Sequence, residues 1–306
     1  MSEHTHLAVH AGQSSIRLRL VGGPDRREGT APGVVVDRSL PPQWAAAVTS
    51  FLTNHPDVHV DTVTLGCSGL GRHNAHEVLR LIDHAGIKRV ILAHDSVTNF
   101  LGALGDGEGC VISANTGTIC LAVGPRETAS VDGWGHLLGD AGSAYWIGRT
   151  ALEAALRGHD GRRQMTALTR AMAEIFPDIE HAHLDLQAAP DRVARIASFA
   201  REVMALAPTD RVAANILDKA AAHLSEAVQA AVRRAHLTSP EPPRVSALGL
   251  VFRNEQVIRR FTDFLTLEWP SFALTLPKGD ALDGASALLA LEPSHPLHGR
   301  LSAAER

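Results

Sequence analysis

The sequence is poor in cysteine and in aromatic residues, and it contains no long apolar run. Its histidines are scattered, and none of their close pairs lies near a cysteine, so ligand spacing predicts no structural metal site. An odd number of widely spaced thiols favours reduced, buried side chains over disulfides. The three cysteines are Cys67, Cys110 and Cys120.

An excess of basic charge is also absent, because the formal net charge is -4 and the isoelectric point is near 6.5. This balance argues against a nucleic-acid partner and against an anionic membrane partner. No apolar run approaches the ~20 residues that span a bilayer, and residues 1–6 lack the apolar core of a signal peptide. We therefore expect a cytoplasmic protein. A length of 306 residues predicts two lobes.

The first hundred residues predict a hairpin followed by alternating strands and helices. Residues 16–20 alternate strictly between apolar and polar side chains, which is the period of a half-buried strand. Three antiparallel strands followed by β-α-β-α predict a mixed sheet with helices on both sides. The predicted elements are strands 7–10, 16–20 and 34–36 with a loop at 22–33, helix 42–53, strand 63–69, helix 74–85, strand 90–95 and helix 96–104.

The second half repeats this order with a longer helical part. Residues 111–113 and 119–123 predict a second hairpin, and a glycine-rich stretch then leads into a helix that ends near Gly158. The later predicted elements are a mainly helical region over 162–236, strand 244–250, helix 254–266, strand 272–276, helix 281–291 and a loose tail from residue 293.

The segment from Gly133 to Gly148 has the composition of a site. Glycine recurs five times in it, beside two of the four tryptophans and the only tyrosine. Glycine serves where the backbone needs a positive φ or approaches a ligand closely. A rigid aromatic side chain beside such glycines favours a shaped pocket. The single acid, Asp140, belongs to this pocket or stabilises the positive end of the helix that begins near Ser143.

Both predicted hairpins have turns of small polar residues. Residues 11–15 and 115–118 offer backbone N–H groups and hydroxyls, which can bind a phosphate. The alternative is an ordinary hairpin loop, because Gly and Thr are common in such turns. The residues alone favour that alternative for the first turn.

Three predicted strands end in residues that are candidates for catalysis or ligand binding. Asp95 follows a buried strand at the edge where open α/β sheets bind ligands, so it is either a general base or the N-cap of the next helix. Ser68 and Gly69 end another strand, and Leu70 rules out the glycine that completes a hydrolase elbow. Gly249 ends a third strand and either faces a ligand or packs closely.

Together these features resemble the N-acetylglucosamine kinase family, which is grouped with the BadF-type ATPases in the actin–hexokinase superfamily. The segment from Gly133 to Gly148 carries the strongest likeness. Asp95 falls where that family has its catalytic aspartate, and both turns match its phosphate loops. Residues 249–252 resemble its adenosine-side motif, and residues 284–285 resemble its closing Gly-Ala.

The resemblance implies an α/β fold with two actin-like (ribonuclease H-like) lobes. Each lobe would contain a mixed five-stranded sheet flanked by helices, with a ligand cleft between the lobes. The N-terminal lobe would span residues 1–108, with the final helix at about 283–300 packed back on it. The C-terminal lobe would span residues 109–282 and include a helical insertion at about 160–236.

The resemblance further implies an ATP-dependent kinase that phosphorylates a hydroxyl of an amino sugar such as N-acetylglucosamine or glucosamine. Mg²⁺ would bridge the ATP phosphates, Asp95 would be the catalytic base, and a homodimer is consistent with the family. The residues assigned to the sugar are Ser68, Gly69, Asp95, Thr118, Gly133, Trp134, Gly135 and Asp140. The residues assigned to the nucleotide are Gly12, Gln13, Ser14, Ser15, Thr116, Gly117, Gly249 and Leu250.

The chain departs from the family pattern on the nucleotide side. His10 and Ala11 replace an acid that helps to hold the metal and the glycine that follows it, and Leu250 replaces a second glycine. Imidazole is a poor Mg²⁺ ligand, because Mg²⁺ prefers oxygen. These departures motivate an alternative, a weak or inactive kinase homologue that binds a sugar or sugar phosphate as a sensor or partner subunit.

A third hypothesis is a reductase-activating ATPase of the BadF type. Such a protein needs cysteines that hold a shared iron–sulfur cluster at a dimer interface. The three cysteines lie in or beside predicted strands, and none follows the adenosine-side motif, so the sequence disfavours this role.

Overall fold

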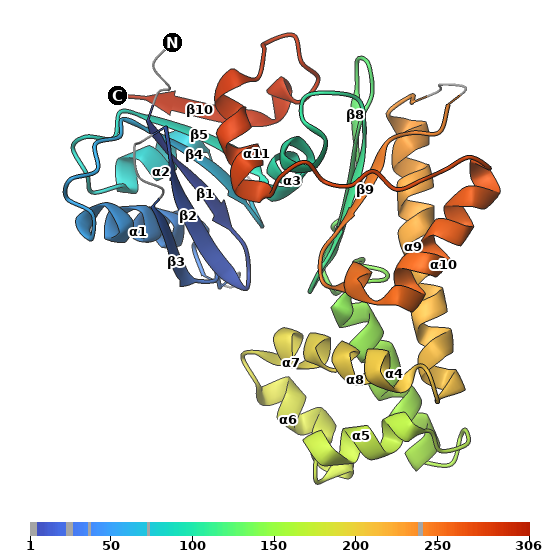
Figure 1. Ribbon diagram of the computed structural model, residues 1–306. Coiled ribbons are helices and arrows are strands. Elements are labelled where there is room, and N and C mark those ends of the chain that lie inside the picture. Colours follow the sequence, from blue (N-terminus) through green and yellow to red (C-terminus); the bar gives the residue numbers. More distant parts are fainter. Residues whose placement is uncertain (1–4, 23–26, 36–37, 72–73, 238–240) are drawn as a thin grey trace. The chain divides into compact units, whose positions relative to one another are not determined.

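The computed structural model describes residues 5–22, 27–35, 38–71, 74–237 and 241–306 (Figure 1). The chain divides into two compact units. The first contains the residues up to Glu108 together with 123–128 and 276–306. The second contains residues 109–122 and 129–275.

Unit 1 is built on a six-stranded sheet with the order β10-β5-β4-β1-β2-β3. Strand β1 pairs antiparallel with β2 and parallel with β4, so the opening hairpin runs directly into the parallel part of the sheet. The strands are β1 (His6–Ala11), β2 (Ser15–Val21), β3 (Glu28–Pro32), β4 (Thr62–Cys67), β5 (Arg89–His94) and β10 (Leu301–Glu305).

Helices cover both faces of this sheet, and the alternation of β1 shows why. Leu7, Val9 and Ala11 face a core that includes Trp44 of α1, whereas Ala8 faces α11 on the other side. The α-helices of unit 1 are α1 (Leu40–Thr53), α2 (Ala75–Leu81), α3 (Asp95–Leu104) and α11 (Ala281–Ala287). Its short 3₁₀ helices are η3 (Leu288–Ala290) and η4 (His298–Arg300).

Unit 2 contains a four-stranded sheet with the order β8-β7-β6-β9, in which β6 and β9 are parallel. Its strands are β6 (Gly109–Ala114), β7 (Thr118–Val123), β8 (Thr128–Asp132) and β9 (Val245–Leu248). The long helix α9 packs on β6, and α4 packs on α5, α7, α8 and α9 (Figure 1).

The helical residues of unit 2 confirm the prediction of a mainly helical region over 162–236. The helices are α4 (Ala144–His159), α5 (Ala167–Ile175), α6 (Ala182–Ala188), α7 (Arg192–Ser198), α8 (Ala200–Leu206), α9 (Arg211–Arg234) and α10 (Glu255–Glu268), with 3₁₀ turns η1 (Ile179–His181) and η2 (Val251–Arg253).

The predicted loop at 22–33 is partly wrong, because β3 lies within it. Residues 28–32 pair antiparallel with β2, and a side chain at Gly29 would meet the Phe51 ring. Edge strands tolerate glycine and proline, which is why the composition suggested a loop. Val34 and Val35 form no strand, and residues 23–26 and 36 lie outside the described residues.

Two predictions at the C-terminus are also wrong. Residues 272–276 form no strand, because only isolated bonds join them to β9, such as Thr275 N–H to Val245 O at 2.8 Å. The predicted loose tail instead contains β10, which pairs antiparallel with β5. The sheets therefore have six and four strands where five each were expected: β10 adds a strand to the first sheet, residues 272–276 do not join the second, and β8, which was not predicted, does.

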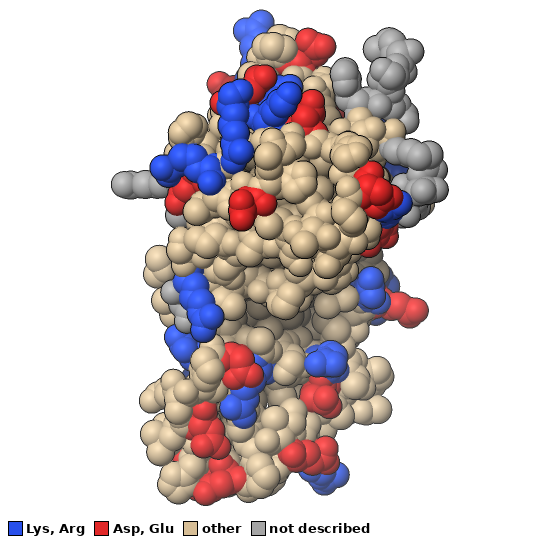
Figure 2. All heavy atoms as spheres, turned by 90° about the vertical axis from the view of Figure 1, so that its left-hand side faces the viewer, with Lys and Arg blue, Asp and Glu red and all other residues tan. Residues whose placement is uncertain are grey.

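All three cysteines are free and buried, as their spacing predicted. Within the described ranges, none of the helices has both the length and the apolar character needed to cross a bilayer. On the face drawn in Figure 2, acidic and basic side chains are interspersed and form no continuous basic area.

Candidate functional site

The predicted site residues fall into two groups, one in each unit. Unit 1 contains Gly12, Gln13, Ser14, Ser15, Ser68, Gly69 and Asp95. Unit 2 contains Thr116, Gly117, Thr118, Gly133, Trp134, Gly135, Asp140, Gly249 and Leu250.

The carboxyl ends of β1, β4 and β5 bring the first group to one edge of the sheet. Ala11 is in register with Cys67, and Cys67 is in register with His94. The next residue of each parallel strand therefore emerges at the same edge. Ser68 connects them, because its N–H donates to Ala11 O at 3.0 Å and its hydroxyl donates to Asp95 Oδ2.

Asp95 is not the N-cap of α3. That position belongs to His94, whose Nδ1 accepts a hydrogen bond from the Ser96 N–H at 3.2 Å. The same Nδ1 atom lies 3.0 Å from Asp95 Oδ1. Among the described residues, the buried Oδ1 has no hydrogen-bond partner. One carboxylate oxygen is therefore held by Ser68, and the other is available to a ligand.

The pKa of Asp95 lies below its ordinary value of 3.8. Burial alone would raise this pKa, but the adjacent His94 and the hydrogen bond from Ser68 outweigh that effect. Asp95 is consequently ionised at neutral pH and can accept a proton.

The first turn is shaped by a residue outside it. Gly12 N–H donates to Ser15 O, and Gly12 O accepts from the Val34 N–H, each at 3.0 Å. A side chain at Gly33 would collide with the Gln13 carbonyl. Gly33 was expected only as part of a loop, so sequence reasoning missed its role. Gln13 and Ser14 are exposed.

The second turn contacts the glycine-rich segment through Asp140. The Thr118 N–H donates to Asp140 Oδ1 at 3.3 Å, and a Cβ placed on Gly117 would lie 2.8 Å from Asp140 Oδ2. Asp140 does not cap α4, because Ser143 does so by accepting from the Trp146 N–H at 3.1 Å. The side-chain cap of α4 is therefore Ser143 and not Asp140.

Burial raises the pKa of Asp140 above 3.8, and the nearby charge of Asp132 adds to this, against the lowering effect of the Thr118 N–H. The backbone of Asp140 is left-handed, with φ of 59°. A left-handed backbone and a buried charge both destabilise the folded state. A carboxylate with both features is more typical of a binding site than of a structural cap.

Asp132 is a residue that sequence reasoning missed. Its carboxylate accepts the N–H groups of Asp140 at 2.7 Å and Ala141 at 3.0 Å, and it fixes the loop between them. The available signal was an acid immediately before Gly133.

The glycines of the segment divide into two kinds. Gly133 and Gly135 have φ of 76° and 79°, so the backbone itself requires them. Gly148 allows close packing, because a side chain there would collide with Ile196 O of α7. Between the first two, Trp134 is 71% exposed and presents its ring outward.

The residues assigned to the adenosine side lie against the second turn. A side chain at Gly249, which has φ of 107°, would collide with Ala114 O, and the Leu250 N–H donates to Asn115 Oδ1 at 2.9 Å. Leu250 has φ of -67° and a side chain that is 58% exposed. Replacement of a glycine by leucine therefore causes no backbone strain here.

A cavity of about 550 Å³ lies at the opposite edge of the unit 1 sheet from Asp95. Thr62 and Arg89, the first residues of β4 and β5, line it together with His6 and Ser286. None of the predicted site residues lines this cavity. We therefore place the candidate site at the carboxyl ends of β1, β4 and β5, where Asp95 lies, and not in the cavity.

Comparison with known proteins identifies relatives of this chain. Residues 37–273 match the model of the BadF/BadG/BcrA/BcrD ATPase family. A curated N-acetylmuramic acid/N-acetylglucosamine kinase from Clostridium acetobutylicum is 28% identical over 231 residues, which cover 73% of this chain and 75% of the relative.

Solved structures support the fold. A candidate N-acetylglucosamine kinase from Chromobacterium violaceum has a TM-score of 0.72 and 24% identity, with 95% of this chain and 100% of the other covered. A ROK family glucokinase from Streptomyces griseus, in complex with glucose and AMPPNP, has a TM-score of 0.55 and 15% identity over 93% and 98% of the two chains. The predicted α/β fold with two helix-flanked sheets is confirmed.

Proposed function

Since the chain belongs to the BadF/BadG/BcrA/BcrD ATPase family, we propose that it is an ATP-dependent sugar kinase acting on an amino sugar. N-acetylglucosamine and glucosamine are the proposed acceptors, and the name of the curated relative from Clostridium acetobutylicum supports this class. The observation that carries the proposal is Asp95, an ionised carboxylate with one oxygen held by Ser68 and the other without a partner among the described residues.

Asp95 would accept the proton of the sugar hydroxyl as that oxygen forms its bond to the terminal phosphorus of ATP. The bond between that phosphorus and the bridging oxygen breaks, and ADP leaves. Phosphoryl transfer depends mainly on positioning and on neutralisation of charge. Ser68 orients the base, and the lowered pKa of Asp95 keeps it unprotonated.

The site residues of unit 2 keep the roles that the resemblance implies. Asp140 and Thr118, with the exposed ring of Trp134, would bind the sugar. The backbone of Gly249 and Leu250, held against the second turn by Asn115, would contact the adenosine.

The donor set at residue 10 does not fit a protein-held Mg²⁺. Mg²⁺ selects oxygen ligands, and His10 offers only ring nitrogen. Within the described part of the chain, no three His, Cys, Asp or Glu side chains gather as a metal site. No protein-held metal therefore enters the proposed reaction.

The test is ATP-dependent phosphorylation across a panel of amino sugars and neutral hexoses. We expect turnover on at least one amino sugar, and Asp95→Asn should reduce kcat by at least about 100-fold, as loss of a general base does. Asp263→Asn is the matched control, because Asp263 is exposed and, among the described residues, its side chain pairs with Arg260 alone, at 3.4 Å.

His10 favours a second candidate, a sugar-binding homologue without kinase activity, because it replaces the acid that the resemblance implies. Sugar binding measured by calorimetry, together with no turnover on any sugar, would establish this candidate and reject the kinase. Turnover that Asp95→Asn abolishes would reject it.

A further inference from the structure

The end of β1 and the start of β2 place an imidazole beside a guanidinium. His10 and Arg17 are partners across the antiparallel pair, so their side chains lie on the same face of the sheet. That face is the one covered by α11, because Ala8, two residues before His10, packs against Leu282 and Ala285. Both side chains flank the first turn.

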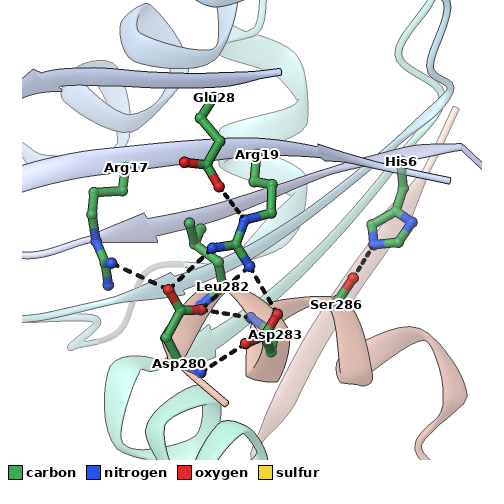
Figure 3. Close-up of polar contacts among 8 residues, drawn as sticks. All are labelled: His6, Arg17, Arg19, Glu28, Asp280, Leu282, Asp283 and Ser286. Carbon is green, nitrogen blue, oxygen red and sulfur yellow. Dashed lines mark hydrogen bonds and ion pairs between the residues drawn. The ribbon is translucent and has the colours of Figure 1, made fainter. Parts of the chain in front are cut away.

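Arg17 differs sharply from Arg19, the next basic residue on that face (Figure 3). Arg19 is 15% exposed and pairs with Glu28 at 2.7 Å, Asp283 at 2.8 Å and Asp280 at 3.2 Å. Arg17 is 40% exposed and reaches only Asp280, at 3.4 Å.

A guanidinium carries five N–H groups in a planar fork. Among the described residues Arg17 makes a single weak contact, so most of its donors have no protein acceptor. The carboxylates of Asp280, Asp283 and Glu28 neutralise Arg19. Of these two arginines, Arg17 is therefore the one whose guanidinium can bind a ligand.

His10 also has unused hydrogen-bonding capacity. Its Nδ1 is buried and has no partner within the described part of the chain. Burial lowers the pKa of His10 below 6.5, and the charge of Arg17 lowers it further, against the opposing charges of Asp95 and Asp280. His10 is thus neutral at pH 7 and can donate one hydrogen bond without adding charge.

We propose that the β1–β2 turn, which the family resemblance assigns to the ATP phosphates, holds no divalent cation at residue 10, and that Arg17 and His10 serve the phosphates in its place. Arginine binds phosphate through two parallel charge-assisted hydrogen bonds, which replace the charge that a metal would supply. Gln13 and Ser14 are exposed, and their backbone N–H groups, with the Ser14 hydroxyl, complete the site. This inference rests on the use of ATP in the proposed function.

The experiment is calorimetric titration of the full chain with ATP, in EDTA and again with excess Mg²⁺. We expect the wild-type Kd values in the two conditions to agree within about threefold, a difference of under 1 kcal/mol. Arg17→Gln should weaken ATP binding by at least about tenfold in both conditions, because a charged hydrogen bond is worth roughly 1.5–3 kcal/mol. AMP, which lacks the polyphosphate, should bind both proteins equally.

Arg19→Gln is the matched control. It removes the same charge from the same face, but its donors already serve three carboxylates. It should lower the melting temperature and leave the Kd for ATP unchanged. Arg17→Lys keeps the charge but not the fork, so it should give an intermediate Kd with a normal melting temperature. His10→Asp should weaken binding in EDTA and restore it with Mg²⁺.

ATP binding that requires Mg²⁺ in the wild type, or that is insensitive to Arg17→Gln, would overturn the inference. Equal losses in Arg17→Gln and Arg19→Gln would also overturn it, since they would mark a structural role. Binding that depends on Arg17, with no phosphorylation of any sugar, would reject the kinase proposal and leave this inference standing. Phosphorylation with Mg²⁺-dependent, Arg17-independent binding would do the reverse.

Discussion

Asp140 combines a structural cost with its proposed role in sugar binding. Its backbone has φ of 59°, and burial raises its pKa, so the ionised side chain opposes folding. Apart from glycine, Asp and Asn are among the residues that best tolerate a left-handed backbone, so asparagine can replace Asp140 without added strain. Substitution of such a residue should raise stability and weaken ligand binding.

We expect Asp140→Asn to raise the melting temperature at pH 7 and to weaken sugar binding by at least about tenfold, the value of one charged hydrogen bond. Between pH 3.8 and the raised folded pKa, the folded state binds more protons than the unfolded state, so stability falls as the pH rises through this window. The gain from asparagine should therefore be complete at pH 7 and should shrink as the pH falls towards 3.8. Differential scanning fluorimetry at several pH values, with Asp263→Asn as control, measures it. A lower melting temperature at pH 7 would show that the charge stabilises the loop.

Between helices α3 and α11, the contact depends on two glycines rather than on large side chains. A side chain at Gly284 would collide with Thr98 O, and one at Gly102 would collide with Asp280 O. The Gly284-Ala285 pair resembles the family's closing Gly-Ala, and the structure shows close packing at Gly284. Neither glycine has a positive φ, so the constraint is space and not conformation.

Gly284→Ala should destabilise the protein by about 1–3 kcal/mol, because overpacking forces the two helices apart. Gly299→Ala is the control, since a Cβ at Gly299 would meet nothing within 4 Å, and it should change stability by less than about 0.5 kcal/mol. Midpoints of urea unfolding measure both. Equal shifts in the two variants would contradict the packing role of Gly284.

The central elements were predictable from local sequence, and the edge strands were not. Strand β2 alternates strictly in burial, and β5 is apolar and buried from Val90 to Ala93, so each carries its own signal. In β3 and β10, small or polar residues such as Gly29 and Ser302 become strand residues only because a partner strand lies beside them. The site residues differ in the same way. Asp95 was predictable because it ends a buried strand, whereas the constraint on Gly33 comes from the Gln13 carbonyl, which local sequence does not place beside it.

The chain returns to its first unit after leaving it, and local sequence could not show this. Residues 276–306 belong to unit 1, where β10 pairs with β5 from Arg89 to Ala93. Ser302 Oγ accepts the first N–H of α2 at 2.9 Å, and Arg306 donates to Leu79 O at 2.6 Å. The C-terminal residues thus connect a strand edge with a helix that lies more than two hundred residues earlier.

Ending the chain after Arg300 should therefore loosen unit 1 at the β5 edge. Loss of β10 leaves the β5 backbone groups on that edge unpaired, while those that face β4 stay bonded. Amide exchange at the β10-facing residues within 89–94 should therefore accelerate by at least about tenfold, which corresponds to 1.4 kcal/mol. Unpaired strand edges also promote association, so light scattering should rise with protein concentration. Hydrogen–deuterium exchange of the full and shortened chains measures the effect, with β6 of unit 2 as the internal reference. Unchanged exchange in β5 would mean that β10 contributes no stability to the sheet, and Ser302→Ala would then separate the bond to α2 from the strand pairing.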